Sequence, residues 1–142
     1  MKIALGADHA GFELKECVKA LLEESKHEVL DLGTCSTEAV DYPDFAEAVG
    51  MAVRDQKAER GILLCGSGVG MDIVANRYPG VRAALAWEPE IGELSRKHND
   101  SNVLVLPARF MTDDQGVETM KAWLNAKFEG GRHERRVKKI EP

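Results

Sequence analysis

The chain has 142 residues, of which 44% are hydrophobic and 30% are charged, and its formal net charge is −5. A chain of this size can bury roughly two-thirds of its unfolded surface, which suits one globular domain. The negative charge argues against general nucleic-acid binding, which needs a positive surface, and no apolar run approaches the ~20 residues of a membrane span.

Short apolar segments alternate with amphipathic segments along the whole chain. The apolar segments predict strands at residues 2–7, 28–32, 61–65, 81–86 and 102–106. Apolar positions at helical spacing between them predict helices at residues 11–25, 42–55, 69–77, 88–98 and 113–128. We therefore expect one domain over residues 1–142, with a basic arm at residues 130–142.

Strands that alternate with helices predict an α/β fold. We expect a three-layer, Rossmann-like arrangement in which a five-stranded parallel sheet carries helices on both faces. The expected strand order is 2-1-3-4-5, which places the topological switch point between the first and third strands. Asp8 and His9 follow the first of these strands, and Cys65 ends the other. Because ligands bind at the carboxyl ends of the strands beside the switch point, we expect these three side chains around one crevice.

The number and spacing of the cysteines indicate a reducing compartment. The three of them, Cys17, Cys35 and Cys65, show no C-x-x-C spacing, and their odd number argues against a disulfide framework. The opening residues predict a strand and not a signal peptide. We therefore expect a cytoplasmic protein.

Cys65 is the strongest candidate for a reactive group. It stands at a strand end, and the N-terminus of the next helix, which follows it, is expected to lower the pKa of the thiol. The alternative is a small buried side chain of the core, which is common for a free cysteine. Cys17 lies within a predicted helix and Cys35 in a polar turn, so neither is favoured.

The glycine-rich loop Gly66-Ser67-Gly68-Val69-Gly70 follows Cys65 directly. Its spacing is not the G-x-G-x-x-G of a dinucleotide site, and no Gly-Lys-Ser/Thr ending completes a P-loop. The alternative to a binding loop is a tight turn between strand and helix. The functional reading is a set of backbone amides beside a thiol, which suits a developing oxyanion or enediolate.

Basic side chains outside the crevice add a second signal. Arg132 and Arg136 are four residues apart in the tail, so a helical tail would place both on one face, and Arg109 follows the last strand. Guanidinium groups match phosphate oxygens, although a solvated terminus is the alternative. His98 ends a predicted helix and can equally be a solvent-exposed cap. No H-x-x-x-H motif and no Cys/His cluster occurs at metal-ligand spacing, so we expect no metal.

Several segments in order resemble the type B ribose-5-phosphate isomerases, in the family that also holds galactose-6-phosphate isomerase subunits. They are ALGADHAGFELK, DLGTCSTEAVDYPDFA, ILLCGSGVGMDIVANRYPGVRAAL, RKHNDSNVLVLPARF and GGRHERRV. The resemblance covers nearly the whole chain. It implies a parallel α/β sheet, a homodimer that shares two active sites, no metal or organic cofactor, and interconversion of ribose 5-phosphate and ribulose 5-phosphate. The sequence leaves open whether two dimers pair into a tetramer.

The resemblance also implies roles for single residues. Cys65 would move the proton between sugar carbons 1 and 2, Ser67 would handle the hydroxyl protons, and His98 would open the furanose ring with help from Asp8. The amides of the loop, in Gly66, Gly68, Val69 and Gly70, would hold the enediolate. The remaining assignments are phosphate contacts by His9, Arg109, Arg132 and Arg136, and substrate contacts by Tyr42 and Asn99.

Two departures and two rival functions accompany this interpretation. Some members of the family use a glutamate deeper in the loop as the base, and here Met71 and Asp72 follow the glycines. Asp72 itself departs from the serine of many relatives. One rival is an isomerase of a six-carbon sugar phosphate, such as allose or galactose 6-phosphate. The other is a non-catalytic sugar-phosphate sensor, which would not need a proton-transfer base.

Overall fold

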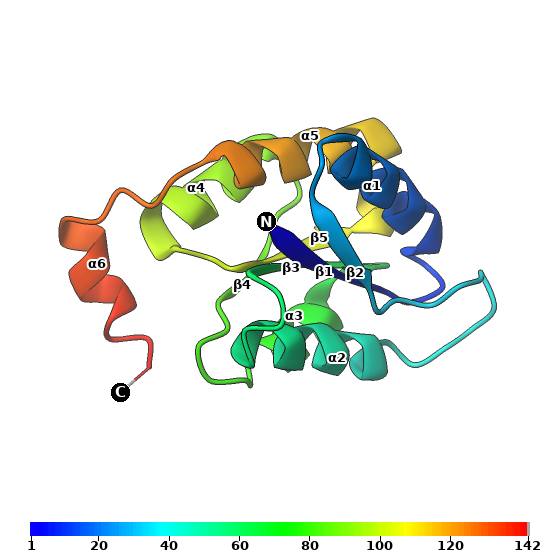
Figure 1. The fold of residues 1–142 in the computed structure, drawn as a ribbon, viewed down its shortest axis with the longest axis horizontal. Helices are drawn as coiled ribbons and strands as arrows, with labels where there is room; N and C mark the ends of the chain where they lie inside the picture. Colours follow the sequence, from blue (N-terminus) through cyan, green and yellow to red (C-terminus); the bar gives the residue numbers. More distant parts are fainter. Residues whose placement is uncertain (142) are drawn as a thin grey trace.

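A computed structural model describes residues 1–141. The strands alternate with the helices along the chain, as Figure 1 shows. The strands are β1 (Lys2–Ala7), β2 (Glu28–Asp31), β3 (Arg60–Cys65), β4 (Ala83–Leu85) and β5 (Val103–Pro107). The helices are α1 (Phe12–Glu24), α2 (Tyr42–Arg54), α3 (Val69–Ala75), α4 (Pro89–Asn99), α5 (Asp113–Asn125) and α6 (Arg132–Val137), with a short 3-10 turn at Ala108–Phe110.

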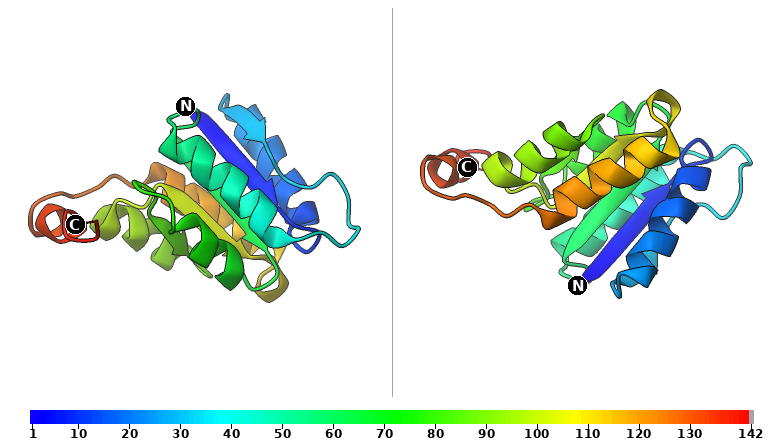
Figure 2. Two further views of the ribbon diagram at one scale, coloured as in Figure 1. Left: turned by 90° about the horizontal axis from the view of Figure 1, so that it is seen from below. Right: turned by 90° about the horizontal axis from the view of Figure 1, so that it is seen from above.

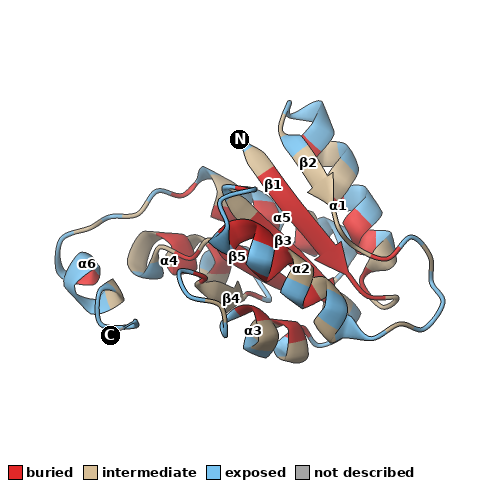
Figure 3. Cartoon of the chain, turned by 60° about the horizontal axis from the view of Figure 1, so that its bottom comes forward, coloured by how far each residue is buried: buried red, intermediate tan, exposed pale blue. Residues whose placement is uncertain are grey.

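The strands form one parallel sheet between two helical layers. Helices α1, α4 and α5 cover one face and α2 and α3 cover the other (Figure 1). Burial is greatest in the central strands, as Figure 3 shows, and Trp123 of α5 is fully buried in the layer above them. The predicted class, a three-layer Rossmann-like fold with a five-stranded parallel sheet, is confirmed.

The strand order is β2-β1-β3-β5-β4, so the predicted order of the last two strands is wrong. Strand β5 pairs with β3 from Gly61↔Val103 to Cys65↔Pro107, and all of its residues are buried. Strand β4 is a three-residue edge strand whose residues are only partly buried. The central position goes to β5 because its side chains are apolar on both faces, whereas β4 is too short to span the sheet. The switch point between β1 and β3 is as predicted.

The last helix stands apart from the sheet. Helix α5 ends at Asn125, three residues before the predicted end, and the following segment leads to α6, which lies beside the end of α4 (Figure 2). Gly130 and Gly131 have positive φ angles of 66° and 56°, a conformation that glycine adopts without steric cost. Among the described residues 1–141, no helix has both the length and the apolar character needed to cross a membrane.

Candidate active site

A cavity of about 360 Å³ opens at the carboxyl ends of β1, β3 and β5. Parallel strands bring these ends to one edge of the sheet, and the switch point between β1 and β3 leaves a crevice there. Residues from four parts of the chain line the cavity: Asp8, His9, Ala10, Tyr42, Cys65, Gly66, Ser67, Gly70 and Arg109. The predicted meeting of Asp8, His9 and Cys65 at this crevice is confirmed.

Asp8 and Cys65 form the centre of the cavity. The thiol of Cys65 donates a hydrogen bond to Oδ2 of Asp8 at 3.2 Å, and both residues are buried. The other carboxylate oxygen, Oδ1, accepts the backbone N–H groups of Ala10 and Gly11 at 3.0 and 3.2 Å. Asp8 is therefore fixed by the turn that leads into α1, and it fixes the direction of the thiol proton in turn.

The pKa of the Cys65 thiol is raised to about 11, so the prediction that this pKa is lowered is wrong for the single chain. Burial raises the pKa most, and the hydrogen bond to Asp8 and the negative charge of Asp8 raise it further. The backbone amides of Gly66 and Gly68 act in the predicted direction, but they are outweighed. The thiol of the single chain is consequently protonated at neutral pH.

Replacing Asp8 tests this account of the thiol. We expect Asp8→Asn to move the pKa of Cys65 below about 11, because the variant loses the carboxylate charge while an amide oxygen can still accept the N–H groups of Ala10 and Gly11. The measurement is the pH dependence of iodoacetamide alkylation, with the exposed Cys17 and Cys35 replaced by serine. An unchanged or higher midpoint would contradict the role given to Asp8.

The glycine loop packs closely against its surroundings. Gly68 has a φ of 77°, and a Cβ there would lie 2.6 Å from Cδ1 of Leu85. A Cβ on Gly70 would lie 2.5 Å from the ring of Tyr42, which lines the cavity. Only glycine allows the backbone to turn this tightly around the thiol, so the amides stay available to an anion.

His9 and Arg109 complete the polar lining. Nδ1 of His9 accepts the backbone N–H of Val40 at 3.2 Å, so neutral His9 carries its proton on Nε2. The side chain of Arg109 lies over Gly66. A Cβ added to Gly66 would lie 3.2 Å from Nη1 of the guanidinium group. The backbone N–H of Arg109 donates to the carbonyl of Gly66 at 3.0 Å. Two donor groups therefore stand beside the thiol and the glycine loop.

Four predicted site residues lie elsewhere in the chain: His98, Asn99, Arg132 and Arg136. His98 and Asn99 end α4 just before β5 begins, at the amino edge of the sheet. Gly61 pairs with Val103 at that edge, and Cys65 lies four residues further along β3, a rise of about 13 Å. The chain therefore does not bring these residues to its own cavity.

The surroundings of these four residues also differ from those of the Cys65 cavity. Asn99 lines a separate cavity of about 270 Å³ together with Arg82 and Ser101. Arg132 and Arg136 are exposed on α6. The roles of these residues came from the family resemblance, which implies a dimer with shared sites, and the sequence left open which subunit supplies each residue.

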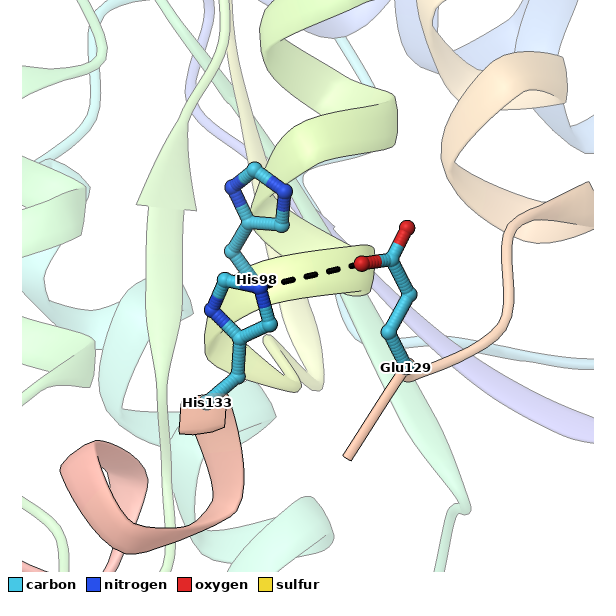
Figure 4. A group of neighbouring side chains, drawn as sticks. All are labelled: His98, Glu129 and His133. Atoms are coloured by element: carbon cyan, nitrogen blue, oxygen red, sulfur yellow. Dashed lines mark ion pairs between the residues drawn. The ribbon is translucent and has the colours of Figure 1, made fainter. Parts of the chain in front are cut away.

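His98 is packed against a residue that sequence reasoning missed. The rings of His98 and His133 stack with their centroids 4.3 Å apart and their planes 8° from parallel, and Figure 4 shows the pair beside Glu129. His133 belongs to the GGRHERRV segment and lies between Arg132 and Arg136, the two predicted phosphate ligands. Its position within that segment was the available signal, but the stack itself depends on how α6 docks.

Known proteins resemble the chain over nearly its full length. The model of the Ribose/Galactose Isomerase family matches residues 3–140. Ribose-5-phosphate isomerase B of Escherichia coli (strain K12) is 47% identical over 139 residues, which cover 98% of this chain and 93% of that protein.

Solved structures give the same result. The crystal structure of a ribose 5-phosphate isomerase from Thermotoga maritima has a TM-score of 0.95 and 50% identity, and covers 99% of this chain and 97% of that one. The ribose-5-phosphate isomerase B of Mycoplasma genitalium, solved with bound ribulose-5-phosphate, has a TM-score of 0.95 and 41% identity over 98% of this chain and 93% of that one. The chain belongs to the ribose/galactose isomerase family.

Proposed function

We propose that this chain is a type B ribose-5-phosphate isomerase, which interconverts ribose 5-phosphate and ribulose 5-phosphate through an enediolate. The observation that carries the proposal is the buried Cys65–Asp8 pair beside the glycine loop. Proton abstraction next to a carbonyl needs a base and preorganised donors for the enediolate oxygen, and this cavity places the Cys65 thiol, whose thiolate would be the base, beside the loop amides. The relatives named above support the substrate, and three free thiols support a cytoplasmic location.

The proposed chemistry moves one proton between two carbons. The Cys65 thiolate takes the proton from carbon 2 of the open-chain aldose, and the aldehyde oxygen becomes the enediolate oxygen. The amides of the loop, in Gly66, Gly68, Val69 and Gly70, stabilise this charge, and Ser67 exchanges the hydroxyl proton. The thiol then returns its proton to carbon 1, which gives the ketose. Asp8 directs the thiol proton while the substrate is absent.

We further propose that a second copy of the chain completes the cavity. Large apolar side chains are exposed around the carboxyl edge, at Tyr42, Val69, Ile73, Trp87 and Phe110. Such a concentration of exposed apolar surface is typical of an interaction site. In a two-fold dimer, the amino-edge groups of one copy can reach the cavity of the other. This arrangement reconciles the positions of the polar residues with one site.

In the completed site, the phosphate is held by His9 and Arg109 of one copy and by Arg132 and Arg136 of the partner subunit. The partner subunit's His98 opens the furanose ring, and Asn99 of the partner subunit contacts the sugar. Phosphate binding positions the reacting carbons without taking part in the chemistry. Positive charge near the thiol also favours the thiolate, which offsets the effect of Asp8 on its pKa.

The decisive assay uses purified protein with ribose 5-phosphate and with allose 6-phosphate. We expect isomerisation of the pentose phosphate, and a rate that EDTA does not change because proton transfer by a thiol needs no metal. A preference for the hexose phosphate would favour the six-carbon isomerase, which differs only in pocket length. Binding of either sugar without turnover would establish a sensor and overturn the proposal.

The proposed phosphate clamp makes a separate prediction. We expect Arg136→Ala to raise KM for ribose 5-phosphate by about 10- to 100-fold, because a charge-assisted hydrogen bond to phosphate is worth about 1.5–3 kcal/mol. The matched control is Arg135→Ala, which removes an exposed guanidinium group from the same helix. Equal KM values in the two variants would leave Arg136 as a solvated residue.

A further inference from the structure

A stack of two histidine rings lies between α4, which carries His98, and α6, which carries Arg132 and Arg136. His133 is the buried residue of α6, and its ring stacks on His98 of α4 (Figure 4). The side chain of His133 is 8% exposed, and Nε2 lies 3.7 Å from Oε2 of Glu129. Within residues 1–141, Nε2 has no hydrogen-bond partner. Stacking and burial therefore hold this ring in place.

The backbone around the stack is shaped to bring the rings together. The N–H of Glu129 donates to the carbonyl of Lys97 at 3.1 Å, which ties the segment before α6 to the last turn of α4. The two glycines with positive φ then reverse the chain, and the N–H of His133 donates to the carbonyl of Gly130 at 3.0 Å. The arm thus reaches α4 through a defined turn, and His133 is the side chain it inserts there.

The same three side chains also have the ligand types that zinc accepts, and their ligand atoms lie within 4.8 Å of one another. The stack argues against a shared ion. Imidazole lone pairs lie in the ring plane, so two stacked, nearly parallel rings hold them in two separate planes that do not meet at one ion. The geometry instead suits ring-on-ring packing that fixes the orientation of His98.

We propose that His133 is a positioning residue that fixes the ring of His98 for sugar ring opening and sets the direction of the arginine-bearing helix α6. This inference rests on the proposed function. Arg132 and Arg136 lie one turn apart on α6 and are exposed, so anchoring that helix through His133 presents both guanidinium groups to solvent. One side chain therefore links the acid–base group to the phosphate clamp.

The groups around the stack lower the pKa of His133, which suits a positioning role. Burial lowers the pKa of His133 most, and His98, Arg132 and Arg136 lower it further, whereas Glu129 opposes them. His133 consequently stays neutral while the neighbouring ring of His98 exchanges a proton with the sugar. Two stacked imidazolium ions would repel each other, so a neutral His133 is compatible with its close stack on His98.

Measuring the reaction in both directions distinguishes a misplaced His98 ring from a general loss of activity. Ribose 5-phosphate is a closed furanose in solution, whereas ribulose 5-phosphate cannot close the same ring, because its 5-hydroxyl carries the phosphate. Only the aldose direction therefore needs ring opening. A variant that cannot open the ring can still convert the ketose and release the aldose in open form, which closes in solution.

The test compares His133→Ala, His133→Phe and the control Arg135→Ala with both substrates. We expect His133→Ala to lower kcat/KM for ribose 5-phosphate by about 10- to 100-fold, the size of effect that misplacing a catalytic group produces. Its kcat for ribulose 5-phosphate should fall by no more than about twofold, while KM for that substrate rises as α6 loses its anchor. His133→Phe keeps a flat ring in the stack and should restore most of the aldose rate.

The outcomes are distinct. Equal losses of kcat in both directions, no loss in His133→Ala, or failure of His133→Phe to restore the aldose rate would each overturn the proposal. His98→Asn serves as the reference. If His98→Asn isomerises ribose 5-phosphate as well as the unmodified protein does, His98 does not open the ring. The role proposed for His133 is then wrong as well. If the unmodified protein isomerises neither substrate, the proposed function itself fails.

Discussion

We expect Cys65→Ala to lower kcat for ribose 5-phosphate by about 100- to 10,000-fold, with little change in KM, because the variant loses the base but keeps the phosphate contacts. The loss should be the same in both directions, since the thiolate acts on both the aldose and the ketose. Steady-state kinetics with each substrate measure this. The alanine removes a buried thiol and leaves Oδ1 of Asp8 bound to the turn before α1, so the fold should persist.

Two further variants make this result specific. Cys35→Ala removes an exposed free thiol and should retain full activity. Asp72 is the other candidate base: burial raises its pKa, and Oδ1 has no hydrogen-bond partner within the described part of the chain, although the residue does not line the cavity of Cys65. Full activity in Cys65→Ala together with a loss in Asp72→Asn would transfer the role of base to Asp72.

Mixing two inactive variants should restore activity. A Cys65→Ala chain has an intact amino edge, with His98, Arg132 and Arg136, and a His98→Asn chain has an intact carboxyl edge. In a hybrid dimer, one of the two shared sites combines both intact edges. With random pairing, half of the dimers are hybrids and half of the sites in them are intact, so the mixture should recover about a quarter of the unmodified activity with ribose 5-phosphate.

The control for this experiment is a chain that carries both substitutions. Mixed with Cys65→Ala, it forms hybrids in which every carboxyl edge lacks the thiol, so no activity should return. The chains are mixed by unfolding and refolding them together, and the hybrid is then isolated through two different affinity tags. The isolated hybrid, in which one of two sites is intact, should show about half of the unmodified activity. Absence of rescue in the first mixture would mean that each site is built from one chain, and the proposed dimer would have to be abandoned.

The class of the fold could be predicted from the sequence, but the neighbours of each strand could not. Alternation of apolar and amphipathic segments is a local property, and it identified every strand of the sheet. The order of β4 and β5 depends on which strand fills the centre. The segment VLVLP of β5 is apolar on both faces, and the prediction did not use this signal. The short length of β4 could be seen only in the structure, because the sequence predicts a strand over residues 81–86.

The cavity was predictable for a different reason. Residues that end neighbouring parallel strands must meet at one edge, so Asp8, His9 and Cys65 could be placed together without any side-chain detail. The pKa of Cys65 could not be predicted, because its shift depends first on how deeply the thiol is buried and then on the direction of the Asp8 carboxylate, which is set by the turn before α1. The stack of His98 and His133 was hidden because it joins two helices that are distant in sequence.

If the proposed dimer completes the site, the placement of His98 and Cys65 at opposite edges of one sheet ties catalysis to protein concentration. If neither edge works alone, dissociated chains are folded but inactive, and mass action sets the active fraction. Specific activity should then fall on dilution while the helical content of the chain persists. Substrate that bridges two copies should oppose this loss, so the sugar phosphate would hold together the assembly that converts it.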